Sequence, residues 1–162
     1  MVKVYLVEDE IIIRQSIKNG IDWEKEGYEF VGDASDGELA LPVILKEKPD
    51  ILITDIRMPF MDGLELSRMV KAELPDIKIV ILSGYDDFEY AKQAIKIGVA
   101  EYLLKPVSSA VLLEHLSEIA EKVRDEREDL ALKKVYYQEM QENEELIKMK
   151  FLGELISGKL SL

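Results

Sequence analysis

The sequence predicts an α/β fold, a doubly wound parallel sheet with helices on both faces. Five short apolar segments alternate with helical patterns, and strict alternation implies right-handed crossovers between parallel strands. The segment Ile77 to Leu82 is almost wholly apolar, as expected for a strand that helices cover on both faces. Asp62 and Asp86 each precede a Glu by three residues, an arrangement related to the capping box that starts a helix. The ligands of such a sheet bind outside the carboxyl ends of its strands.

The individual elements follow from the same patterns. Pro42 lies inside the second helical pattern, beyond its first turn, where it removes one backbone donor and is expected to bend the helix. Trp23 lies in the loop between the first helix and the second strand, and we expect its indole to pack against the edge of the domain. The five expected strands are Val2 to Val7, Phe30 to Ala34, Ile51 to Thr54, Ile77 to Leu82 and Ala100 to Leu104.

After about Ser108 only helix is expected, because no Pro or Gly occurs before Gly153. Apolar residues recur there at spacings of three and four, and Glu126 and Lys133 interrupt them. Two interpretations stay open: a short coiled coil, or a helix that packs on its own domain and then projects, which the interrupting charges favour. We expect a domain at residues 1–125 and a helical linker, the start of a following region, at 126–162. The apolar positions are Leu112, Leu116, Ile119, Val123, Leu130, Tyr137, Met140 and Ile147.

Composition limits the possible partners. The chain has 162 residues, of which 48% are hydrophobic, enough for one packed domain and a tail. Its net charge of −12 repels phosphate backbones and anionic lipids, so this segment is not expected to bind nucleic acid or membranes. There is no cysteine, which excludes thiolate metal sites and a cysteine nucleophile. No signal-peptide pattern or membrane-spanning stretch occurs, and we expect a cytoplasmic protein.

Acidic residues follow two of the expected strands. Glu8 and Asp9 come directly after the first strand, and Asp55 comes directly after the third. A single acid at a strand end is usually solvated or caps a helix. Three carboxylates at one sheet edge would repel one another unless a cation lies among them. Oxygen ligands without His or Cys favour Mg²⁺.

Two further polar residues end the later strands. Ser83 closes the fourth strand and Lys105 closes the fifth. Each alone is weak evidence, since a strand-end Ser is usually a turn residue and a Lys before Pro is usually solvated. Together with the acids they supply a carboxylate nucleophile, a metal site, a hydroxyl donor and a cation, the groups that phosphoryl transfer requires.

Ordered motifs over residues 1 to 125 resemble the receiver domain of two-component response regulators. Receivers belong to the flavodoxin-like folds, so the resemblance implies a five-stranded sheet of order 2-1-3-4-5. The extended C-terminal helix expected from the residues after Ser108 would follow that sheet. The motifs are Val7-Glu8-Asp9-Glu10, Ile53-Thr54-Asp55-Ile56-Arg57-Met58-Pro59 with Met61-Asp62-Gly63, Ser83-Gly84-Tyr85, and Glu101-Tyr102-Leu103-Leu104-Lys105-Pro106.

The resemblance implies that Asp55 accepts a phosphoryl group from a phosphohistidine on a sensor histidine kinase. Asp9 and Asp55 would bind Mg²⁺ directly, Glu8 would bind it through water, and the main-chain carbonyl of Arg57 would supply a further ligand. The protein would then be a switch, and not an enzyme beyond its own phosphorylation and dephosphorylation. Many relatives have Asp at the position of Glu8 and Gly at the position of Phe60. The Phe60 ring is hypothesised to hinder small phosphodonors.

The resemblance also assigns the residues that respond to the new charge. Ser83 and Lys105 would hold the phosphoryl oxygens, and Tyr102 would move inward together with Ser83. The corresponding Lys-Pro bond is commonly cis in the family, so the resemblance implies a cis bond at Lys105-Pro106. Output is expected on the face of the fourth helix, fifth strand and fifth helix, which is one possible homodimer surface; the C-terminal helix is another. His115, on the fifth helix, is expected at the surface or in an interface.

A narrower resemblance concerns the effector. The loop Ile21-Asp22-Trp23 and the tail from Lys150 to Gly158 resemble regulators that carry an AraC-type DNA-binding domain. No helix-turn-helix with a basic recognition helix occurs up to Leu162, so DNA binding and transcriptional control would belong to sequence that is absent here.

Two other classes of function compete with the switch. A metal-dependent phosphatase of the haloacid dehalogenase type also uses an aspartate nucleophile, a hydroxyl, a lysine and Mg²⁺. Those enzymes carry the nucleophile on an early strand, with a second acid two residues later. In this chain Arg57 occupies that later position, and the acidic pair Glu8 and Asp9 precedes the nucleophile. The third interpretation is a helical dimerisation module with the globular part as its scaffold.

Overall fold

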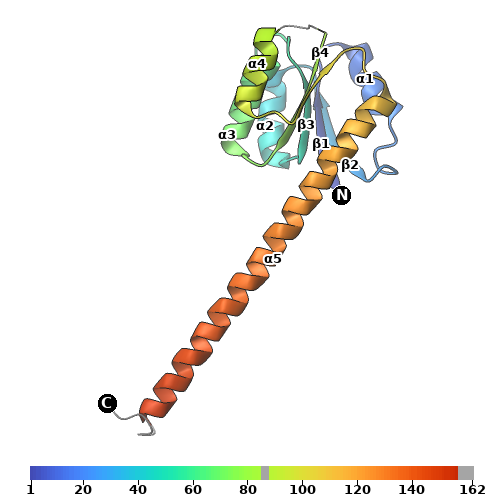
Figure 1. The fold of residues 1–162 in the computed structure, drawn as a ribbon. Coiled ribbons are helices and arrows are strands. Elements are labelled where there is room, and N and C mark those ends of the chain that lie inside the picture. The colour runs from blue at the N-terminus through green and yellow to red at the C-terminus, as the bar shows by residue number, and fades with distance from the viewer. Residues whose placement is uncertain (85–87, 157–162) are drawn as a thin grey trace. The chain divides into compact units, whose positions relative to one another are not determined.

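The protein contains one five-stranded parallel sheet, in a computed structural model that describes residues 1–84 and 88–156. The strand order is β2-β1-β3-β4-β5, which confirms the predicted fold (Figure 1). The second strand begins two residues earlier than expected because Tyr28 pairs with Val2 and is buried. The strands are β1 (Val2–Val7), β2 (Tyr28–Ala34), β3 (Ile51–Asp55), β4 (Lys78–Ser83) and β5 (Glu101–Leu104).

Helices cover both faces of the sheet. Those on one face are α2, α3 and α4, while α1 and the first turns of α5 pack on the other (Figure 1). The Asp62 side chain accepts a hydrogen bond from the backbone N–H of Glu65, which confirms the predicted start of α3. Asp86 lies outside the described residues. Pro42 lies inside α2 as expected. The helices are α1 (Ile11–Gly20), α2 (Gly37–Glu47), α3 (Gly63–Glu73), α4 (Phe88–Ile97) and α5 (Ser109–Ile156).

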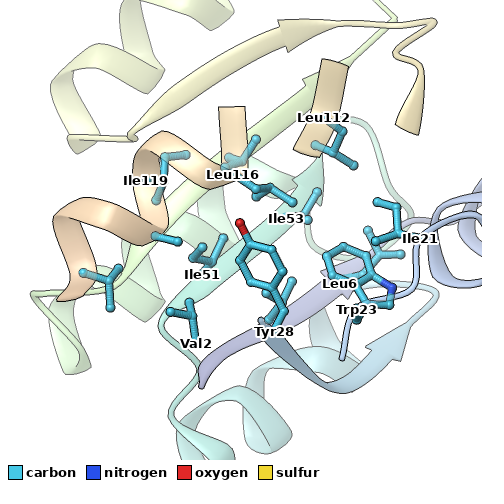
Figure 2. Packing of buried hydrophobic residues seen from close by; sticks show 14 of the residues in the cluster. Val2, Leu6, Ile21, Trp23, Tyr28, Ile51, Ile53, Leu112, Leu116 and Ile119 are labelled. Carbon is cyan, nitrogen blue, oxygen red and sulfur yellow. The ribbon is translucent and has the colours of Figure 1, made fainter. Parts of the chain in front are cut away.

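Each face of the sheet has its own hydrophobic core. On the α1 and α5 face, Leu112 and Leu116 of α5 pack over Ile53 of β3 and its neighbours (Figure 2). Trp23 is buried in this core, and its indole N–H donates to the Lys18 carbonyl oxygen at 3.0 Å. The packing role predicted for Trp23 is thereby confirmed. The core of the opposite face contains side chains from α2, α3 and α4.

The parallel register brings the carboxyl ends of the strands to one edge. Val7 of β1 pairs with Thr54 of β3, so the residues that follow them are neighbours. Asp55 pairs with Leu82, and Ser83 pairs with Leu104. The chain segments with Glu8, Asp9, Asp55, Ser83 and Lys105 therefore lie at the same edge of the sheet.

The chain divides into two compact units, and the boundary between them falls within helix α5. The first unit is Met1–Val123 and the second is Arg124–Leu162. Within the first unit, Leu112, Leu116, Ile119 and Val123 are buried, as their spacing indicates. In the second unit, the side chains from 124 to 154 are exposed. No helix of the described residues is long and apolar enough to cross a membrane.

Candidate functional site

Three carboxylates meet at the carboxyl edge of the sheet. One carboxylate oxygen from each of Glu8, Asp9 and Asp55 lies within 4.8 Å of the other two. Glu8 and Asp55 are buried, and Asp9 is partly exposed. The structure thus brings together the three acids that the sequence singled out, because β1 and β3 are direct neighbours.

Lys105 joins this cluster from the loop after β5. Its Nζ lies 2.6 Å from Glu8 Oε1 and 3.2 Å from Asp55 Oδ2. Burial raises the pKa of Glu8 to about 7, and the hydrogen bond from Lys105 opposes that rise. Burial and the neighbouring Asp55 also raise the pKa of Asp9. Burial alone would lower the pKa of Lys105, but the hydrogen bond to Glu8 and the charge of Asp55 raise it. The site therefore holds more negative charge than one ammonium group neutralises.

The backbone around Asp55 fixes the orientation of its carboxylate. Oδ1 accepts a hydrogen bond of 2.7 Å from the N–H of Ile56, which leaves Oδ2 directed toward Lys105. The loop then turns sharply, and the N–H of Gly63 donates to the Ile56 carbonyl oxygen at 2.7 Å. A Cβ atom at Gly63 would lie 1.8 Å from the Asp55 carbonyl oxygen, so only glycine fits this position.

Ser83 and Tyr102 lie on the neighbouring strands β4 and β5. Ser83 is fully buried at the end of β4, and its carbonyl oxygen accepts a hydrogen bond of 2.7 Å from the N–H of Lys105. Tyr102 is partly buried and packs against the core on the α2, α3 and α4 face. The Lys105-Pro106 peptide bond is cis, as expected. The movement predicted for Tyr102 stays a prediction.

Arg57 makes a contact that sequence reasoning missed. Its Nε donates to the Tyr90 hydroxyl oxygen of α4 at 3.0 Å, and its guanidinium carbon lies 5.4 Å from the centre of the Tyr90 ring. The loop that carries Asp55 is thereby tied to α4. No sequence signal marks the pair, because the two residues are 33 positions apart and neither belongs to an apolar pattern.

The structure also places Phe60 and His115, two residues that the sequence singled out. Phe60, in the loop after Asp55, is 82% exposed and has a φ of 70°. This left-handed conformation favours glycine, the residue that many relatives of the resembled family carry there. His115 is partly exposed, as expected, and its Nδ1 lies 3.4 Å from Glu101 Oε1.

Comparison with known proteins agrees with this geometry. Residues 4–117 match the response regulator receiver domain family. The uncharacterized transcriptional regulatory protein YesN of Bacillus subtilis is 42% identical over 134 residues, which are 83% of this chain and 36% of that protein. The transcriptional regulatory protein HptR of Staphylococcus aureus (strain NCTC 8325 / PS 47) is 45% identical over 112 residues, 69% of this chain and 44% of that protein. The chain therefore spans less than half the length of these curated relatives.

Solved structures give the same assignment. The receiver (REC) domain of AraT, a response regulator from Geobacillus stearothermophilus, superimposes with a TM-score of 0.73 at 41% identity, covering 78% of this chain and 99% of that one. A two-component transcriptional regulator AraC from Clostridium phytofermentans gives a TM-score of 0.69 at 29% identity, covering 80% of this chain and 99% of that one. With its strand order and its match over residues 4–117, the chain belongs to the response regulator receiver domain family.

Proposed function

We propose that this chain is a phosphorylation-dependent switch in which Asp55 accepts a phosphoryl group from a sensor histidine kinase. The observation that carries this proposal is the position of the Asp55 carboxylate, which lies at the sheet edge beside two other acids and 3.2 Å from Lys105 Nζ. Membership in the receiver family supports the same role.

The chemistry is a transfer between two nucleophiles. An Asp55 carboxylate oxygen attacks the phosphorus of a phosphohistidine, a P–O bond forms, and the P–N bond breaks. The departing imidazole takes up a proton from solvent. The product is an acyl phosphate stored in the protein, so the modification is the signal and not a step toward turnover.

The acidic cluster is suited to a divalent cation. It presents oxygen donors from three carboxylates, and only one ammonium group, that of Lys105, lies among them, so a cation would offset the remaining negative charge. We propose Mg²⁺, held directly by Asp9 and Asp55, through water by Glu8, and by the main-chain carbonyl of Arg57. Bound Mg²⁺ would offset charge on the phosphoryl oxygens.

Ser83 and Lys105 are proposed to bind the phosphoryl oxygens, and Tyr102 to change position with Ser83. The new charge-assisted hydrogen bonds would favour an altered arrangement of the face formed by α4, β5 and α5 by a few kcal/mol. The hydrogen bond from the backbone N–H of Lys105 to the Ser83 carbonyl oxygen supports this coupling, because it links the end of β4 to the residue that follows β5. A shift of one strand end would therefore be transmitted to the other.

The output is proposed to be transcriptional, and the protein cytoplasmic. Curated relatives named as transcriptional regulators support the first statement, and DNA binding would require an effector region beyond Leu162. We assign residues 1–125 to the receiver and residues 126–162 to a helical linker. We propose the α4, β5 and α5 face and the C-terminal helix as two candidate surfaces for a homodimer.

The test is the intact mass of the chain after incubation with Mg²⁺ and a small phosphodonor. The native chain should gain one phosphoryl group, and Asp55→Ala should gain none. Asp76→Ala, which makes the same change at an exposed acid remote from the cluster in sequence, is the matched control and should be phosphorylated like the native chain. An equal adduct on Asp55→Ala, or no adduct on the native chain, would overturn the proposal. Repeated turnover of a phosphomonoester would favour the phosphatase instead.

A further inference from the structure

The second unit of α5 carries an apolar seam that no part of the described chain covers. Its side chains, Leu130, Tyr137, Met140 and Ile147, are 46 to 64% exposed. Long helices in proteins owe most of their stability to the packing of an apolar face, so this seam calls for a partner. Spacings of three and seven between these positions are those of a coiled-coil seam.

Two charged residues occupy the same seam. Lys133 lies three residues after Leu130, and Glu144 lies three residues before Ile147. Both side chains are exposed. A partner that places an opposite charge against each of them is therefore favoured over one that places a like charge there.

A second copy of the chain meets this demand in one of the two possible orientations. In a parallel pair each seam residue faces its own counterpart, so Lys133 would face the partner's Lys133 and Glu144 would face the partner's Glu144. In an antiparallel pair centred between residues 138 and 139, Lys133 faces the partner's Glu144, and the same contact occurs twice by symmetry. The antiparallel orientation turns two repulsive layers into two attractive ones.

The apolar positions fit the same register. Leu130 then faces the partner's Ile147, and Tyr137 faces the partner's Met140, so apolar layers lie on both sides of each charged layer. At the rim, Asp129 comes near the partner's Lys150, a favourable pair. Arg127 comes near the partner's Lys148, an unfavourable one, which solvent at the rim screens.

We infer that the helix from Leu130 to Ile147 binds a second copy of this chain as an antiparallel coiled coil, with Lys133 and Glu144 paired across the interface. The inference concerns the linker and goes beyond the proposed phosphoryl transfer. It does not depend on Asp55, and it is tested without a phosphodonor, so either proposal can fail without the other.

Charge reversal in the full 162-residue chain tests the pairing. Sedimentation equilibrium should show a dimer whose dissociation constant rises about tenfold in Lys133→Glu, because Glu then faces Glu twice. The double variant Lys133→Glu/Glu144→Lys should return to within about threefold of the native value. Glu142→Lys lies off the seam and controls for the Glu144→Lys change within the double variant. It should leave the dissociation constant of the dimer unchanged. A native chain that stays monomeric, or a double variant no tighter than Lys133→Glu, would overturn the inference.

Cysteine cross-linking tests the orientation independently, since the native chain has no cysteine. A Leu130→Cys chain mixed with an Ile147→Cys chain should form a disulfide between the two variants under mild oxidation. Each variant alone should cross-link poorly. Efficient self-cross-linking of each variant, with little mixed product, would indicate a parallel pair and contradict the inference.

Discussion

Lys105 Nζ lies 2.6 Å from Glu8 Oε1, although 97 residues separate them in the sequence. The same ammonium group is 3.2 Å from Asp55 Oδ2, so one side chain partly neutralises two buried carboxylates. Because the pair is largely shielded from water, the loss of either partner leaves a poorly solvated charge behind.

Lys105→Met should therefore destabilise the metal-free protein. We expect its free energy of unfolding to fall by about 1–3 kcal/mol, because Glu8 and Asp55 lose their cation. Urea denaturation with a chelator measures the change. Lys122→Met, at an exposed position of α5, is the control and should have little effect. Equal stability of Lys105→Met and the native chain would contradict the proposed neutralising role.

Asp9→Asn should have the opposite effect on stability. The raised pKa of Asp9 means that its ionised form is disfavoured in the folded cluster, so removing its charge should stabilise the metal-free protein. The stabilisation that Mg²⁺ gives the native chain should be lost. Thermal unfolding with and without Mg²⁺ measures both effects.

The neighbouring exposed acid supplies the control for that experiment. Glu10→Gln removes a charge from the same loop, and it should retain the response of the native chain to Mg²⁺. If Asp9→Asn still gained as much stability from Mg²⁺ as the native chain, Asp9 would not be a metal ligand.

Phe60→Gly should both stabilise the loop and open the site. Glycine adopts a φ of 70° without the strain of a side chain, and the exposed ring loses little packing, so we expect a gain of about 0.5–1 kcal/mol. Phosphorylation by a small phosphodonor should be faster. Phe60→Ala separates the two effects, because it removes the ring but keeps the strain. An unchanged rate in both variants would reject the hindrance hypothesis.

The contact between Arg57 and Tyr90 should couple the phosphorylation loop to α4. A double-mutant cycle with Arg57→Ala and Tyr90→Phe, which removes only the hydroxyl group of Tyr90, is expected to give a coupling free energy of about 0.5–1 kcal/mol in the unphosphorylated protein. Urea denaturation of the four proteins measures it. Strictly additive effects would mean that the hydrogen bond does not contribute to stability.

The sequence was informative where local pattern and topology agree. The apolar segments before Asp55 and Glu8 predicted buried strands, and parallel pairing then predicted that their terminal acids would meet. The start of β2 was less predictable, because Tyr28 joins an edge strand through its pairing with Val2 and not through an apolar run of its own.

Other features depend on contacts that no local pattern records. The Arg57–Tyr90 hydrogen bond joins the β3–α3 loop to α4, and Phe60 adopts its left-handed conformation within that loop. The proximity of Lys105 to Glu8 also requires the whole sheet, since β3 and β4 separate their strands. Such relationships appear only once the tertiary structure is assembled.

The most direct measurement locates the phosphoryl group. Borohydride reduces an aspartyl phosphate to homoserine, so the chain is incubated with Mg²⁺ and a phosphodonor, reduced, digested and sequenced by mass spectrometry. The account predicts homoserine at position 55, with Asp9 unmodified. Homoserine at another aspartate, or a stable phosphoryl group on a serine, tyrosine or histidine, would contradict it.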